Sequence, residues 1–252
     1  MKTNWEFNNS FDAIVFDCDG TLSQIEGIDQ LAEMNGVGGK VKEMTANAMG
    51  EGGLTLEIYE ERLNIVQPTT AQLLTLGEMY AEKVTPFAST VIQDLQELGK
   101  SVYIMSAGLL PSVLQLGEFL GVPRENVFAV DIMLDANSGA YKDFDRKSPL
   151  TTSVGKATIL KKLSAQHKRI ALIGDGMNDA ASAHAVDCFI GFGGNFDRQI
   201  IREKSDFYIS ERTLLPVLPL CATPDEVEGI SPVESDYKLA LKCFDKGVTR
   251  QD

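Results

Sequence analysis

The sequence predicts a doubly wound α/β fold with a parallel sheet, interrupted after its first strand by a small helical insertion. Short, continuously apolar runs of strand length alternate with stretches whose apolar residues recur at helical spacing, which is typical of βαβ units. Several of the strand-like runs end in small or acidic residues. Between the first and second runs, by contrast, the apolar residues of 23–84 recur at helical spacing.

The first predicted strand, residues 13–16, ends at two aspartates separated by one residue. Side chains alternate along a strand, so Asp17 and Asp19 should point the same way, at the strand ends where open parallel sheets bind ligands. Two such carboxylates disfavour each other's ionisation, and a divalent cation would relieve this. Mg²⁺ prefers oxygen ligands of this kind. An acidic turn without chemistry is the alternative.

The insertion reads as a bundle of short helices, because its apolar stripes are interrupted by glycine clusters at 36–39 and 50–53 and by Pro68. Such an insertion is well placed to act as a lid. From Pro86 onward, strand and helix alternate. The predicted elements are a helix over 91–98, a strand over 102–105 that stops at Ser106, a helix over 111–120 and a strand pair of 127–134 with 140–144.

A helix beginning at Gly155-Lys156 follows, and residues 170–173 form a central strand that ends in the sequence GDGMND. One further βα step runs through 189–191 and 207–209. The polar tail suggests a short helix. The predicted division is therefore a core of 1–22 and 85–221, a helical cap of 23–84, and an extension of unknown role at 222–252.

Charge and composition limit the partners. The net charge of −13 over 252 residues would repel nucleic acid and anionic membranes. The first ten residues have no apolar signal core, and no run approaches the ~18 apolar residues of a membrane helix, so we expect a cytoplasmic protein. The four cysteines are scattered, which favours buried free thiols. Neither histidine follows a strand, so histidine acid-base chemistry is not expected.

Polar groups at four strand or helix ends form a candidate site. Taken alone, Ser106 could be a turn cap, Lys156 a helix-start residue, and GDGMND a helix cap. Taken in order with FDCDGTL, they match all four motifs of the haloacid dehalogenase superfamily phosphatases, which this sequence resembles. The groups are Asp17 with Asp19, Ser106, Lys156, and Asp175 with Asn178 and Asp179.

This resemblance implies a mechanism. Asp17 would attack phosphorus to form an aspartyl-phosphate, and Asp19 would act as acid and then as base. Ser106 and Lys156 would bind the phosphoryl oxygens. Mg²⁺ would be held by Asp17, the main-chain carbonyl of Asp19 and Asp175, with Asp179 orienting Lys156 or a metal-bound water.

The cap segments IDQLAE, TANAMGEG and ERLNIVQPT resemble those of the phosphoserine phosphatase family, and FIGFGGN with Arg198 resembles its animal and plant type. The resemblance implies that the substrate is O-phospho-L-serine, whose carboxylate Arg62 and whose ammonium group Glu26 would bind. Its hydrolysis would be the last step of serine biosynthesis. The further substrate-binding residues implied are Met49, Gly50, Ser106, Ala107, Gly108, Lys156, Asn178 and Arg198.

One departure leaves alternatives open. The family usually has Ser-Gly-Gly-Phe where this chain has Ser106-Ala107-Gly108-Leu109, so another small phosphate ester, or phosphoryl transfer to a hydroxyl, is a rival. A non-enzymatic receiver-type domain also gathers aspartates and a lysine at strand ends, but it has neither the insertion nor the DxDGT motif. A monomer or a homodimer is expected.

Overall fold

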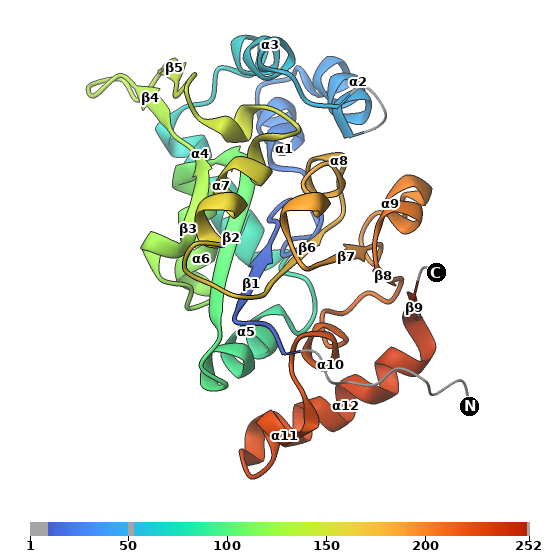
Figure 1. Cartoon of the computed structure of the whole chain (residues 1–252). Coiled ribbons are helices and arrows are strands. Elements are labelled where there is room, and N and C mark those ends of the chain that lie inside the picture. The colour runs from blue at the N-terminus through green and yellow to red at the C-terminus, as the bar shows by residue number, and fades with distance from the viewer. Residues whose placement is uncertain (1–9, 50–52, 251–252) are drawn as a thin grey trace.

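The computed structural model describes residues 10–49 and 53–250. A seven-stranded sheet runs through its centre in the order β3-β2-β1-β6-β7-β8-β9 (Figure 1). Every neighbouring pair is parallel except β8 with β9. The strands are β1 (Ala13–Phe16), β2 (Ser101–Leu109), β3 (Val127–Val130), β6 (Ile170–Gly174), β7 (Cys188–Phe192), β8 (Phe207–Ile209) and β9 (Val248–Arg250).

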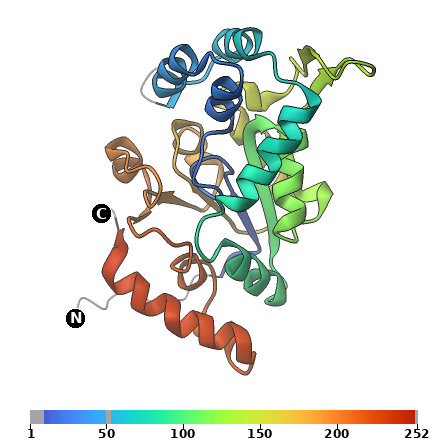
Figure 2. The same ribbon diagram turned by 180° about the vertical axis from the view of Figure 1, so that it is seen from behind.

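The middle of this sheet is apolar throughout. Val15 of β1 lies opposite Tyr103 of β2 and Leu172 of β6, and every residue of β1 and β6 is buried. Burial on both faces explains the unbroken apolar runs of the sequence. Helices α5 (Ala88–Glu97) and α6 (Leu110–Phe119) cover one face, and α7 (Gly155–Leu163) covers the other (Figures 1 and 2). The predicted α/β class is confirmed.

The insertion contains the helices α1 (Gly27–Met34), α2 (Gly38–Met49), α3 (Leu56–Val66) and α4 (Thr70–Glu82). The first three lie beyond the carboxyl ends of the parallel strands, and α4 runs from there along the side of the core (Figures 1 and 2). Threonines set two of the starts, because Thr55 caps α3 and Thr69 forms a capping box with Gln72 at α4. Helix α4 also packs against α6 of the core, where the Ser112 hydroxyl donates to the Leu73 carbonyl at 2.7 Å. This helix therefore joins the cap to the core.

The strand pair predicted from 127–134 divides at Asp131. Residues 127–130 form β3, which is parallel to β2, whereas β4 (Ile132–Leu134) pairs with β5 (Tyr141–Phe144) in an antiparallel hairpin. The Asp131 carboxylate accepts a hydrogen bond from the amide of Ile132, which turns the chain between the two strands. The hairpin reaches the cap, since the Gly139 carbonyl accepts from the amide of Thr70 at 2.9 Å.

The tail is longer and better integrated than the predicted short helix. Helix α12 (Ser231–Gly247) packs on α5 and α10 (Val217–Cys221), and β9 then extends the sheet. Val233, Tyr237 and Ala240 form its buried stripe. In the described part of the chain, no helix is long and apolar enough to cross a membrane. The remaining short helices are α8 (Met177–Ala180), α9 (Gln199–Lys204), α11 (Pro224–Val227), η1 (Arg124–Asn126), η2 (Pro149–Thr151) and η3 (Ala183–Ala185).

Candidate active site

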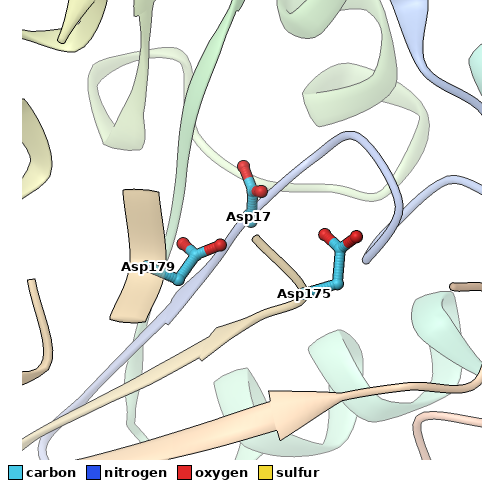
Figure 3. A group of neighbouring side chains, drawn as sticks. All are labelled: Asp17, Asp175 and Asp179. Carbon is cyan, nitrogen blue, oxygen red and sulfur yellow. The ribbon is translucent and has the colours of Figure 1, made fainter. Parts of the chain in front are cut away.

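Three buried carboxylates meet at the ends of the two central strands (Figure 3). Asp17 follows β1, Asp175 follows β6, and Asp179 lies on α8 just beyond. One oxygen from each lies within 4.8 Å of the others. We call these residues the carboxylate cluster. Its formation follows from topology, because parallel neighbours end at the same edge of the sheet.

Two cations lie against the carboxylate cluster. The ammonium group of Lys156, at the start of α7, is 2.8 Å from Asp17 Oδ1 and 2.6 Å from Asp179 Oδ1. Burial lowers the pKa of Lys156, but the carboxylates of Asp17 and Asp179 outweigh this and raise it, so Lys156 stays charged. Arg198 donates to the carbonyl of Asp175 at 2.8 Å and also to its carboxylate.

Burial, together with the charge of Asp17, raises the pKa of both Asp175 and Asp179, and that of Asp175 reaches about 6. The carboxylates of the cluster therefore repel one another even with Lys156 and Arg198 in place. A set of oxygen donors alone, closely spaced and short of positive charge, suits a hard divalent cation. The residues present fit the expected metal.

Glycine is required at the turn between the motif aspartates and α1. Gly20 has φ +71°, and a Cβ there would overlap the carboxylate of Asp175. The amide of Asn195 holds the same turn, donating to the Gly20 carbonyl at 3.1 Å. The DG pair of the first motif thus lets the second acidic motif approach β1.

Asp19 is bound on both carboxylate oxygens. Its Oδ1 accepts from the amide of Gly27 and from the hydroxyl of Tyr80, each at 2.6 Å, and its Oδ2 accepts from the Ser106 hydroxyl at 3.1 Å. Burial and the nearby charge of Asp17 raise the pKa of Asp19, while these hydrogen bonds lower it. The net rise favours a carboxyl that can hold a proton in a closed site.

The segment around Ser106 differs from the prediction. Strand β2 does not stop at Ser106 but runs to Leu109, and its register against β3 shifts between Met105 and Leu109. Ser106 to Gly108 occupy this irregularity, where the Ser106 hydroxyl accepts from the amide of Gly108 at 2.8 Å. The bulge thus places the Ser106 hydroxyl between the Gly108 amide, which donates to it, and Asp19 Oδ2, to which it donates.

A cavity of about 50 Å³ separates the cap from the core beside Asp19. Arg62 of α3 lines it with 6% of its surface exposed, and the guanidinium makes no ion pair within the described residues. Its contacts are Thr45 Oγ1 at 3.4 Å and the ring of Tyr59. Burial lowers its pKa. The other lining residues are Asp19, Glu26, Gly27, Ile28, Leu31, Leu54, Tyr59, Leu63, Leu76, Tyr80, Ala107, Gly108, Leu109 and Asn178.

Two buried polar atoms at this cavity, Arg62 Nε and Asn178 Oδ1, have no hydrogen-bond partner among the residues that the structure describes. Buried donors and acceptors are nearly always paired in proteins. An unpaired donor and an unpaired acceptor in one cavity therefore mark a place where a polar ligand binds.

The predicted substrate residues divide into two groups. Glu26, Arg62, Ala107, Gly108 and Asn178 line the cavity, and Ser106 adjoins it through its hydrogen bond to Asp19. Lys156 is not among the lining residues and pairs with Asp17 and Asp179 of the carboxylate cluster. Arg198 is not among the lining residues, since its side chain pairs with Asp175 and, at 3.1 Å, with Glu26 Oε1. Gly50 and the side chain of Met49 lie outside the described part.

Sequence reasoning missed two tyrosines of the site. Tyr59 donates to the Ala107 carbonyl at 3.0 Å, and Tyr80 donates to Asp19. Both belong to apolar helical stripes, which indicated core packing. Nothing in that spacing distinguishes a tyrosine that only packs from one that meets a carboxylate.

The fold and this site define a class of hydrolase. The chain belongs to the haloacid dehalogenase-like hydrolase family, whose model matches residues 11–187. Within it, the chain is similar to the phosphoserine phosphatase of Bos taurus, with 35% identity over 216 residues that cover 84% of this chain and 96% of that protein. The chloroplastic phosphoserine phosphatase of Arabidopsis thaliana is 32% identical, covering 79% and 69%. The predicted family and hydrolase class are confirmed.

Solved structures agree. A phospho-aspartyl intermediate analogue of phosphoserine phosphatase superposes with a TM-score of 0.72 at 25% identity, covering 85% of this chain and all of that chain. A substrate-bound phosphoserine phosphatase complex gives a TM-score of 0.73 at 24% identity, with the same coverage. The second likeness concerns the fold alone.

Proposed function

We propose that this protein is a Mg²⁺-dependent phosphomonoesterase that hydrolyses O-phospho-L-serine to L-serine and phosphate through an aspartyl-phosphate on Asp17. The observation that supports this substrate most directly is Arg62, a buried cation with no ion-pair partner in the described part of the chain, in a cavity that is also lined by Glu26 and Asp19. The animal and plant relatives named phosphoserine phosphatase support the same assignment.

Recognition follows from charge. A guanidinium binds a carboxylate bidentately, so the substrate carboxylate would satisfy Arg62, including its unpaired Nε. Glu26 gives one oxygen to Arg198, and its second oxygen remains for the substrate ammonium group. Asn178 Oδ1 can accept a further hydrogen bond from the substrate. Together these groups distinguish an amino-acid phosphate from a plain alkyl phosphate.

The first half-reaction uses Asp17 and Asp19. An oxygen of Asp17 attacks phosphorus while the bond from phosphorus to the serine oxygen breaks, and Asp19 donates its proton to that oxygen. Lys156, at 2.8 Å from Asp17 Oδ1, orients the nucleophile and offsets the charge of the phosphoryl oxygens. The Ser106 hydroxyl and the Gly108 amide donate to the same oxygens.

The second half-reaction reverses these roles. Water attacks phosphorus and breaks its bond to Asp17, and Asp19, now ionised, takes the proton of the water. Asp17, the main-chain carbonyl of Asp19 and Asp175 would hold Mg²⁺, and Asp179 would hold Lys156 in place. Bound there, Mg²⁺ would supply the positive charge that lets an anionic nucleophile approach an anionic ester.

A second candidate is hydrolysis of another small phosphate ester, or phosphoryl transfer to a hydroxyl acceptor. It is favoured by the mostly apolar cavity wall and by Ala107 and Leu109, both of which line it. The place of the reaction in serine biosynthesis, the cytoplasmic location and a monomeric or homodimeric state stay predictions.

The test is phosphate release in Mg²⁺ from phosphoserine, phosphothreonine and a set of sugar phosphates. We expect phosphoserine to give the highest kcat/KM. Added L-serine or homoserine should not divert phosphate into a new ester. Asp17→Asn, which keeps the shape of the side chain, should remove turnover without lowering the melting temperature. A sugar phosphate as preferred substrate would refute the proposed recognition, and full activity of D17N would refute the mechanism.

A further inference from the structure

The two oxygens of Asp19 have different surroundings. Oδ1 accepts two short hydrogen bonds from the cap, one from the amide of Gly27 at the first turn of α1 and one from Tyr80 on α4. Oδ2 accepts a longer bond, from the core hydroxyl of Ser106. Because a carboxylate oxygen has two lone pairs in its plane, the donors of the cap occupy Oδ1 fully. A proton on Asp19 is therefore left to Oδ2.

Oδ2 lies beside the two residues that are expected to bind the phosphoryl group. It accepts from the Ser106 hydroxyl at 3.1 Å, and a Cβ built on Gly108 would lie 3.1 Å from it. A proton on Oδ2 is then directed toward the phosphate ester. A proton on Oδ1 would instead have to displace one of two donors.

Tyr80 is placed for this contact rather than merely packed. It is fully buried in the apolar stripe of α4, where phenylalanine would fill nearly the same volume without a polar group. Its hydroxyl takes the space that a Cβ on Gly27 would need. Buried phenol hydroxyls require a partner, and Asp19 Oδ1 provides it. Helix α4 is itself tied to the core through Ser112, which fixes the position of the hydroxyl.

We propose that Tyr80 is a positioning residue for the proton donor, whose hydroxyl bond to Asp19 Oδ1 directs the proton on Oδ2 toward the leaving oxygen. The inference rests on the proposed function and deepens it. The proton passes from Oδ2 to the ester oxygen as its bond to phosphorus breaks and the bond from Asp17 forms. In the second step the proton of the attacking water goes to Oδ2, so each turnover restores the starting state.

The leaving group provides a test that a purely structural role would not pass. An alkoxide such as that of serine must be protonated as it leaves, whereas p-nitrophenolate leaves without a proton. General acid catalysis contributes about 10²- to 10⁴-fold, so misplacing the acid should cost a sizeable part of this for phosphoserine alone. The relevant step is the first half-reaction, since water attack needs Asp19 as a base with either ester.

The experiment compares Tyr80→Phe with the wild type in rapid-quench single turnovers, in Mg²⁺, with phosphoserine and with p-nitrophenyl phosphate. We expect Y80F to slow first-turnover serine release roughly tenfold or more, and nitrophenol release less than about twofold. Tyr237→Phe is the matched control, because it removes a buried hydroxyl of α12 that donates to the Ala222 carbonyl, away from the cavity. Y237F should leave both rates unchanged.

Equal effects of Y80F on the two esters, or an unchanged serine release, would overturn the role of Tyr80. Should Y80F fail to fold, as judged by its melting curve, Tyr80→Met serves in the same comparison. A wild type that hydrolyses p-nitrophenyl phosphate but not phosphoserine would overturn the proposed substrate instead. The effect of Y80F would then be compared between p-nitrophenyl phosphate and the alkyl phosphate that the enzyme does accept.

Discussion

Replacing Arg62 by methionine should weaken the enzyme and stabilise the empty protein at the same time. Arg62 is 6% exposed, has no ion pair within the described residues, and has a pKa that burial lowers. In the absence of substrate, the fold thus bears the cost of a desolvated charge. Methionine has a similar length and no charge, so Arg62→Met removes this cost together with the anchor for the substrate carboxylate.

The two effects have different sizes. Hydrogen bonds to charged groups contribute about 1.5–3 kcal/mol each, so loss of a bidentate contact should cost about 3 kcal/mol in kcat/KM, or roughly 100-fold. Replacing buried ionic groups by apolar ones of similar volume has stabilised proteins by about 1–4 kcal/mol. For a chain of this size, each kcal/mol raises the melting temperature by about 2–4 °C.

The assay is kcat/KM for phosphoserine and for p-nitrophenyl phosphate, with thermal melting of the ligand-free protein. R62M should lose activity on phosphoserine, change little on the aryl ester, and melt a few degrees higher. Arg202→Met is the control, because the Arg202 side chain is partly exposed and pairs with the exposed Asp197, so its loss should shift stability by less than about 1 kcal/mol. Equal activity losses on both esters, or a lower melting temperature, would refute the reasoning.

Three further predictions concern Asp94, the bound metal and Gly27. Asp94 of α5 is 5% exposed, and its Oδ2 has no hydrogen-bond partner within residues 10–49 and 53–250. Burial, with the charges of Asp236 and Glu97, raises the pKa of Asp94 to about 6. This pKa lies above the value of about 3.9 in the unfolded chain, so the stability that protonated Asp94 contributes is present below pH ~4 and is lost as the pH rises through 6. D94N should therefore be more stable than the wild type at pH 7, by at most about 3 kcal/mol, and equally stable near pH 4. Urea denaturation at both pH values checks this, and a constant difference would contradict it. Chelation with EDTA should abolish phosphate release, and excess Mg²⁺ should restore it. Mg²⁺ at 100 times its Kd should also raise the free energy of unfolding by about 2.7 kcal/mol, which is seen as a higher melting temperature. Activity that survives chelation would rule out the metal. Gly27→Ala should push the Tyr80 hydroxyl from Asp19 and slow phosphoserine turnover more than that of p-nitrophenyl phosphate, whereas wild-type kinetics would show that the contact is unimportant.

The positions of the acidic motifs could be predicted because they depend on local rules. A buried parallel strand is recognisable as an apolar run, and its end fixes where the next polar residue lies. Topology then brings Asp17 and Asp175 together, since β1 and β6 are neighbours. Lys156 could be placed at a helix start for the same reason.

Features that depend on long-range contacts could not be predicted. Helical spacing indicated that Tyr80 faces inward, but not that it meets Asp19. Both halves of 127–134 are apolar, so nothing local indicated that Asp131 divides them between two sheets. Arg198 carries a positive charge suited to an anionic substrate, yet in the structure its partners are Asp175 and Glu26, which lie far from it in sequence.

The last strand, β9, covers the edge of β8 and forms one border of the sheet. Without β9, the backbone groups of β8 that now pair with Val248 to Arg250 would be open to pairing with another chain, and the apolar side of α12 would no longer shield α5 and α10. A chain shortened before α12 would thus keep every residue of the candidate site but would expose an unpaired strand edge and an apolar surface. We therefore expect such a shortened chain to fail by self-association while its active site stays intact.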